Sequence, residues 1–148
     1  MIPIKDLRIG DLVKTTTRNP ILEKGSVCKV VLIDALINSI IVQKSDVDVC
    51  RCLVKEEIEG IPLTPEILEK NGWQTKMYGG SQFFCIELNC YLELCVTYVN
   101  EDNNFSVGTF SHIPGGDLDI NYFPIDIKYV HELQHILWAL GEDAKLII

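Results

Sequence analysis

Short runs of β-branched and aromatic residues recur along most of this sequence, and turn-forming residues interrupt them after only a few positions. In the first part of the chain these runs cover residues 7–13, 27–33, 39–42 and 47–54. Four or five strands at such close spacing are typical of a small antiparallel sheet that curls on itself. Residues 1–60 are therefore expected to form an SH3-like small β-barrel.

Residues 61–148 combine further strands with two helices. Strands are expected at 73–78, 83–88, 91–99 and 105–110, where apolar runs alternate with turn residues. Together they predict an antiparallel meander.

The helix signals of this second part lie on either side of the meander. Thr64 as N-cap, Pro65 as first helical residue and the pair Asn71-Gly72 as stop indicate a short helix. After a glycine-rich link at 113–117, a second helix is expected from about Asp126 to Gly141. The predicted fold class is α+β, with a boundary near Gly60.

The charge of the chain is unevenly distributed. Residues 1–60 hold nine basic and nine acidic side chains, whereas residues 61–148 hold four basic and twelve acidic ones, which accounts for the net charge of −8. An acidic surface repels nucleic-acid phosphates and anionic lipids. The charge therefore argues against nucleic acid as a partner, and no apolar run reaches the length of a membrane-spanning helix.

The amino terminus lacks the basic and then apolar pattern of a secretory signal, so a cytoplasmic location is expected. The sequence contains six cysteines, most of them inside strand-like runs, and in that compartment they are expected to be reduced and mostly buried. Cys50 and Cys52 form a C-x-C pair, which an extended strand separates too far for a shared zinc ion.

The segment His131-Glu132-Leu133-Gln134-His135 matches a zinc-peptidase motif. Histidines at positions i and i+4 of a helix can ligate one Zn²⁺, and the intervening glutamate can activate the bound water. His112 or Glu142 is available to complete the set of ligands. One hypothesis is therefore a minimal zinc-dependent hydrolase with Glu132 as the catalytic base.

Two features of the same segment argue against zinc. Helical projection of residues 126–141 places Val130, Leu133, Leu137 and Leu140 on the core stripe. Both histidines project away from this stripe and are expected to face solvent unless another part of the chain encloses them. Zinc peptidases of this type take a third ligand from downstream, but only residues 136–148 follow His135, and their candidates are Glu142 and Asp143. The favoured interpretation has no cofactor and no catalytic residue.

Aromatic and soft apolar side chains gather around one turn of the expected meander. Such a composition occurs both in cores and at protein interfaces. Core packing is the more common use, but if exposed together these residues are the first place to look for a partner: Trp73, Met77, Tyr78, Phe83 and Phe84.

Three segments of the chain resemble an uncharacterised family of small proteins from gut anaerobic bacteria, their prophages and mobile elements. These segments are 7–13, 61–73 and 129–134. In that family the positions that match Glu132 and His135 often carry other residues. The resemblance implies an accessory protein of phage or mobile-element origin and supplies no mechanism.

Three functions follow as hypotheses. The first is a non-enzymatic accessory protein that binds another protein, and the second is the zinc-dependent hydrolase. The third, motivated by the acidic charge, is a counter-defence protein that sequesters a signalling nucleotide or mimics nucleic acid.

Overall fold

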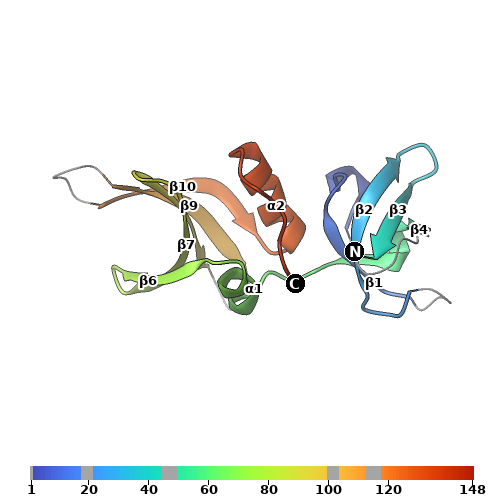
Figure 1. Cartoon of the computed structure of the whole chain (residues 1–148), viewed down its shortest axis with the longest axis horizontal. Coiled ribbons are helices and arrows are strands. Elements are labelled where there is room, and N and C mark those ends of the chain that lie inside the picture. The colour runs from blue at the N-terminus through green and yellow to red at the C-terminus, as the bar shows by residue number, and fades with distance from the viewer. Residues whose placement is uncertain (1, 18–21, 45–49, 100–103, 113–117) are drawn as a thin grey trace. The chain divides into compact units, whose positions relative to one another are not determined.

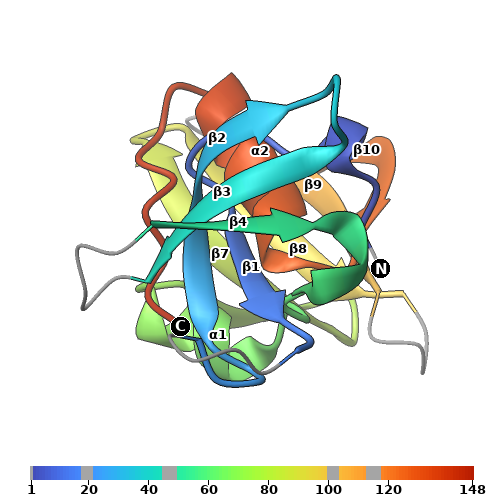
Figure 2. The same cartoon turned by 90° about the vertical axis from the view of Figure 1, so that its right-hand side faces the viewer.

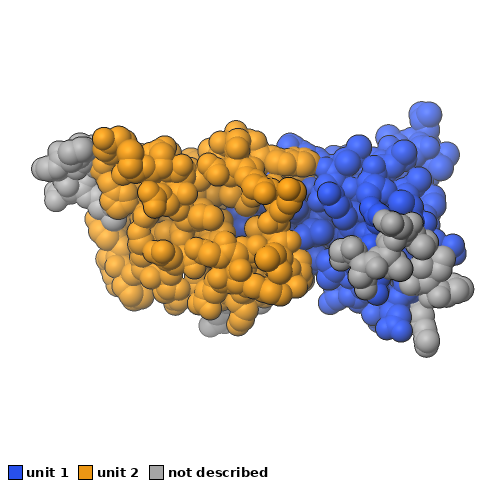
Figure 3. Space-filling model, viewed as in Figure 1, with its two compact units in different colours: residues 1–61, 129–134 blue, residues 62–128, 135–148 orange. Residues whose placement is uncertain are grey.

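The computed structural model describes residues 2–17, 22–44, 50–99, 104–112 and 118–148. These residues contain two five-stranded antiparallel sheets, two α-helices and two short 3₁₀ turns, so the α+β class is confirmed (Figure 1). The chain divides into two compact units, coloured separately in Figure 3: residues 1–61 with 129–134 form unit 1, and residues 62–128 with 135–148 form unit 2. Unit 1 is thus discontinuous in sequence, which was not expected.

Unit 1 is built on one antiparallel sheet with the strand order β4-β3-β2-β1-β5 (Figure 2). Within the residues described, β4 and β5 are the two edges, so the sheet is open there. Residues 47–49 of the expected fourth strand lie outside the described residues. The elements are η1 (Ile4–Asp6), β1 (Leu12–Thr15), β2 (Val27–Asp34), β3 (Ser39–Lys44), β4 (Cys50–Val54), η2 (Lys55–Glu57) and β5 (Ile58–Gly60).

The core of unit 1 follows from the two-residue period of its strands. In β1 every second side chain is buried, Val13 and Thr15, because successive side chains point to opposite faces of a sheet. The amino-terminal segment adds Ile2, Ile4 and Leu7 to the same core. The other buried members are Leu22, Cys28, Val30, Ile40, Val42, Leu53 and Ile58.

Unit 2 contains the second sheet, with the strand order β10-β9-β8-β7-β6. The four strands predicted from the sequence are all present within a few residues of their expected limits. A further strand at the edge, β10, was not predicted. The elements are α1 (Pro65–Lys70), β6 (Gln74–Tyr78), β7 (Ser81–Asn89), β8 (Leu92–Tyr98), β9 (Phe105–His112), β10 (Leu118–Ile127) and α2 (Val130–Ala139), whose first five residues belong to unit 1.

Both faces of the second sheet bury side chains. Leu94 and Val96 of β8 are fully buried on one face, where Phe84 packs edge-on against Phe105 with ring centroids 6.4 Å apart. The opposite face has a smaller apolar cluster of Phe83, Cys85, Cys95 and Phe110, against which Ile120 packs.

Helix α1 begins and ends as its sequence predicts. The Thr64 side-chain oxygen accepts a hydrogen bond from the Ile67 amide at 3.4 Å, and Pro65 occupies the first turn. Gly72 follows with φ of 84°, a left-handed conformation that suits glycine.

Helix α2 is shorter than the sequence predicts. It begins at Val130 rather than near Asp126, because Asp126 belongs to β10 and pairs with Ser106. It ends as expected before Gly141, whose φ is 80°, and the Glu142 amide donates to the Leu137 carbonyl in a Schellman arrangement. Leu140, expected on the core stripe, lies beyond the helix and is 40% exposed.

In the part of the chain that the structure describes, neither helix has the length and apolar character needed to cross a membrane.

Candidate functional site

The glutamate of the zinc-peptidase motif forms the start of helix α2. One Glu132 carboxylate oxygen accepts a hydrogen bond from the Tyr129 amide at 2.9 Å. Tyr129 precedes the helix by one residue, so Glu132 occupies the third helical position, from which a glutamate commonly reaches back to the cap. A carboxylate is also favoured there by the helix dipole. Glu132 therefore has a structural use that needs no metal.

His131 was expected to face solvent unless another part of the chain enclosed it, and the structure buries it. Its side chain is only 3% exposed, and its ring lies against that of Tyr129 with centroids 5.7 Å apart and planes inclined by 14°. The projection assumed a single buried stripe along the helix. The first half of α2 instead belongs to unit 1 and the second half to unit 2, so more than one side of the helix is buried.

Gln134 holds the first half of α2 to the amino-terminal strand of unit 1. Its side-chain oxygen accepts from the Leu12 amide at 3.0 Å, and its side-chain nitrogen donates to the Gly10 carbonyl at 3.4 Å. The side chain is 5% exposed. This role could not be predicted, because a glutamine beside an apolar stripe is also common at the surface.

Replacing Gln134 with Ala is expected to destabilise unit 1 by about 1–3 kcal/mol, because the partly buried Leu12 amide then loses its acceptor. Hydrogen exchange at the Leu12 amide measures the effect directly and is expected to accelerate. The exposed Gln82 supplies a control, since Gln82→Ala removes the same groups from the surface. Unchanged exchange at Leu12 would contradict the role given to Gln134.

The candidate zinc ligands are divided between the two units. His131 belongs to unit 1, whereas His135, His112 and Glu142 belong to unit 2. His112 is near an acidic partner of its own sheet, with its ring nitrogen 3.5 Å from a carboxylate oxygen of Glu93. Among the described residues, no group of three or more His, Cys, Asp or Glu side chains is arranged to hold a metal ion.

Glu93 is also bound by Lys76, which makes a cluster of three ionisable side chains on one face of the second sheet. The Lys76 ammonium donates to both Glu93 carboxylate oxygens, at 2.5 and 2.7 Å. The Glu93 side chain is 14% exposed, so this ion pair is partly shielded from water. The three side chains come from different strands, Lys76 from β6, Glu93 from β8 and His112 from β9. The ion pair between Lys76 and Glu93 spans the intervening strand β7.

Two thiols lie in the apolar cluster beside these charges. Cys85 of β7 and Cys95 of β8 are directly opposite each other, and both are 2% exposed. A hydrogen bond between the thiols lowers the pKa of Cys85, while the same bond and burial raise the pKa of Cys95 far above its usual value. All six cysteines are free thiols. The prediction that most of them are buried was wrong, since Cys50, Cys52 and Cys90 are exposed.

The aromatic surface suggested by the sequence is mostly core. Trp73, Phe83 and Phe84 are each no more than 3% exposed, so they are not available to a partner. Phe83 and Phe84 are interior because neighbouring positions of β7 pack on the two opposite faces of the sheet, and both faces are covered. Trp73 lies directly before β6. Only Met77, 69% exposed, and Tyr78, 41% exposed, remain at the surface.

A more exposed apolar feature occurs in unit 1, at the turn between β2 and β3. Leu36 is 97% exposed and Ile37 is 68% exposed. The turn is fixed by Asp34, whose carboxylate oxygen accepts from the amides of Leu36 at 3.0 Å and Ile37 at 3.3 Å. We call residues 34–38 the hairpin tip. The predicted strands at 27–33 and 39–42 leave these residues as a connecting turn, but a Leu-Ile pair in a turn does not by itself indicate an exposed apolar surface.

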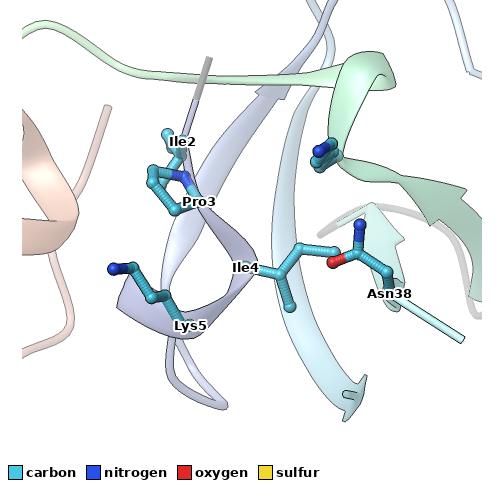
Figure 4. A pocket seen from close by; sticks show the side chains of 6 residues that line it. Ile2, Pro3, Ile4, Lys5 and Asn38 are labelled. Atoms are coloured by element: carbon cyan, nitrogen blue, oxygen red, sulfur yellow. The ribbon is translucent and has the colours of Figure 1, made fainter. Parts of the chain in front are cut away.

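A pocket of about 390 Å³ lies next to the hairpin tip in unit 1. Figure 4 shows its amino-terminal wall, made by residues 2–5, with the Ile4 side chain directed toward Asn38 of the tip. Its lining residues are Ile2, Pro3, Ile4, Lys5, Asn38 and Lys55.

Comparison with known proteins leaves these local features as the basis for inferring function. No protein-family model, no curated protein and no solved structure matches the chain. In the described part of unit 1, the hairpin tip exposes two large apolar side chains and a pocket lies next to it.

Proposed function

We propose that this chain is a non-enzymatic accessory protein of phage or mobile-element origin that acts by binding another protein through unit 1. The observation that carries the proposal is the hairpin tip, where two large apolar side chains are exposed on a turn fixed by Asp34. The suggested origin rests on the family resemblance of segments 7–13, 61–73 and 129–134.

The energetics of the tip favour an intermolecular use. Scattered apolar residues are normal on a protein surface, but adjacent ones on a preorganised turn lose little conformational freedom when a partner covers them. Complete burial of a leucine or isoleucine side chain contributes about 1.5–3 kcal/mol each. Leu36 and Ile37 together therefore supply enough free energy to anchor a moderate interface.

The proposal includes an SH3-like barrel for unit 1. The support is the path of the chain: β1 to β4 form consecutive antiparallel pairs, the 3₁₀ turn η2 follows, and β5 returns to pair with β1. A register shift between Val30 and Leu32 in β2 adds curvature, as irregularities of this kind bend a strand. Small barrels of this kind offer their connecting turns to partners, and the hairpin tip is such a turn.

Replacing both Leu36 and Ile37 with Asp is expected to abolish partner binding while changing the stability of unit 1 by no more than about 0.5 kcal/mol, because both side chains are exposed. The measurement is quantitative mass spectrometry of proteins cross-linked to the wild type and to the variant in native host cells. A partner is expected to be enriched at least about tenfold with the wild type.

Met77→Asp provides the matched control, since Met77 is the most exposed member of the aromatic surface suggested by the sequence. This substitution is expected to leave the amount of cross-linked partner unchanged. Loss of capture with Met77→Asp but not with the hairpin-tip variant would move the binding surface to β6 and contradict the proposal for unit 1.

A further inference from the structure

We infer that the pocket beside the hairpin tip binds an acidic, extended segment of the protein partner. A large apolar side chain of this segment enters the pocket, and acidic residues flank it in the partner's sequence. This inference rests on the proposed function and adds the chemistry of the ligand. It is drawn from the size of the pocket, its lining and its continuity with the tip.

The pocket has the dimensions of a small binding site. Its volume of about 390 Å³ falls in the range of ligand sites, roughly 300–1,000 Å³. The apolar part of its lining comes from the exposed Pro3 and from the small accessible parts of Ile2 and Ile4, whose side chains are otherwise buried in the core of unit 1. A leucine-sized side chain fits this volume, and the wall that receives it is held in place by the core.

The charges of the lining select the flanking residues of the ligand. Lys5 and Lys55 line the pocket, and none of the described lining residues is acidic. The Lys55 ammonium is 3.7 Å from a carboxylate oxygen of Glu56, but both side chains are about half exposed. Such surface ion pairs contribute little free energy and exchange readily with a ligand carboxylate.

Most of the negative charge of the chain lies outside residues 1–60. Residues 61–148 carry a net charge of −8, from four basic and twelve acidic side chains, so an acidic ligand is repelled by that part of the protein. A lysine-lined pocket in unit 1 is then a local site where carboxylates are favoured. Charge complementarity of this kind determines where and how fast a partner docks more than how tightly it binds.

The tip and the pocket form one continuous surface. Asn38 lines the pocket and directly follows Ile37 in the hairpin tip, where its φ of 53° turns the chain into β3. A partner that covers Leu36 and Ile37 is therefore one residue away from the pocket. The apolar tip provides contact area, and the pocket provides selectivity for sequence.

A peptide titration of the full chain tests the inference. The probe is a short acetylated peptide in which leucine alternates with aspartate, and the matched control has lysine in place of aspartate. With ¹⁵N-labelled protein, the acidic peptide is expected to shift the amide signals of Ile2, Ile4, Asn38 and Lys55. The lysine peptide is expected to leave them unchanged at the same concentration.

Replacing both Lys5 and Lys55 with Glu is expected to weaken binding of the acidic peptide at least tenfold (about 1.4 kcal/mol). The same binding is expected to weaken as salt concentration rises, because the charges involved are exposed to solvent. The milder Lys5→Gln and Lys55→Gln double variant provides a second test if the glutamate variant fails to give a folded spectrum.

Equal binding of the two peptides, shifts confined to other residues, or no shifts at all would overturn the inference. If capture of a partner still depends on Leu36 and Ile37, that result leaves the proposed function intact and removes only the pocket assignment. A dimer formed by the wild type and lost in the lysine variants would instead identify a second copy of this acidic chain as the ligand, against a separate partner.

Discussion

Gly60→Ala is expected to lower the free energy of unfolding of unit 1 by about 2–3 kcal/mol, because the site has no space for a methyl group. A Cβ atom built on Gly60 lies 2.5 Å from Cδ1 and 2.6 Å from Cγ of the Tyr129 ring. Both are ring atoms near the Tyr129 backbone, so the clash is not relieved by a small motion of a flexible end. Gly60 is not among the residues with positive φ, so its requirement for glycine is one of space and not of conformation.

The Gly60 prediction is best measured by hydrogen exchange in β1. Val13 is opposite Gly60 in the sheet, and the amides of β1 report on the opening of unit 1. A double-mutant cycle with Tyr129→Ala isolates the clash, since the cost of Gly60→Ala is expected to fall by at least about 1 kcal/mol once the ring is absent. An equal cost in both backgrounds would show that Tyr129 is not the obstacle.

Phe84→Ala is expected to destabilise unit 2 by about 3–5 kcal/mol, the largest effect foreseen for this chain. Phe84 is fully buried in β7, and its ring meets those of Tyr98 and Phe105 edge-on, with both centroid distances at 6.4 Å. The ring centroids of Tyr98 and Phe105 are themselves 4.4 Å apart. Removing Phe84 leaves a cavity and deprives two further rings of their contact.

Tryptophan fluorescence during urea unfolding measures the Phe84 effect, because Trp73 and Trp138 both belong to unit 2. The midpoint is expected to fall sharply for Phe84→Ala. Tyr91→Ala is the control, since Tyr91 is an aromatic residue of the same sheet region that is 58% exposed. A midpoint for Phe84→Ala within the range of this control would refute the placement of Phe84 in the core.

Local signals in the sequence predicted the elements whose determinants are themselves local. Thr64 and Gly72 mark the limits of α1 because capping and left-handed backbone depend on single residues. The strands β6 to β9 of the meander were likewise recognisable, from apolar runs that alternate with turn residues. By contrast, β10 contains Pro124 between two asparagine- or aspartate-containing stretches, which suggests a loop. An edge strand with a register shift between Tyr122 and Asp126 tolerates these residues, because one of its sides needs no partner strand.

Properties of the candidate sites that depend on long-range packing were not predictable. His131 and Gln134 are buried because residues 129–134 pack within unit 1, and no pattern in the helix itself indicates that contact. The zinc-peptidase motif is recognisable from the spacing of its residues. That spacing does not reveal that the Glu132 carboxylate accepts a hydrogen bond from the Tyr129 amide. A turn at 34–38 followed from the predicted strands on either side of it. The exposure of Leu36 and Ile37 was not predictable, because it depends on the turn conformation that Asp34 fixes.

The discontinuity of unit 1 also affects the order of events during synthesis. Gln134 is 122 residues from Leu12 and 124 residues from Gly10, yet it bonds to both. Contacts over such separations form late, and on a ribosome the amino-terminal sheet emerges long before its last segment does. Nascent unit 1 therefore remains incomplete, with the Leu12 amide lacking its Gln134 acceptor, until residue 134 has been translated. Premature termination anywhere before residue 134 is expected to leave an amino-terminal fragment that chaperones or proteases recognise as incomplete.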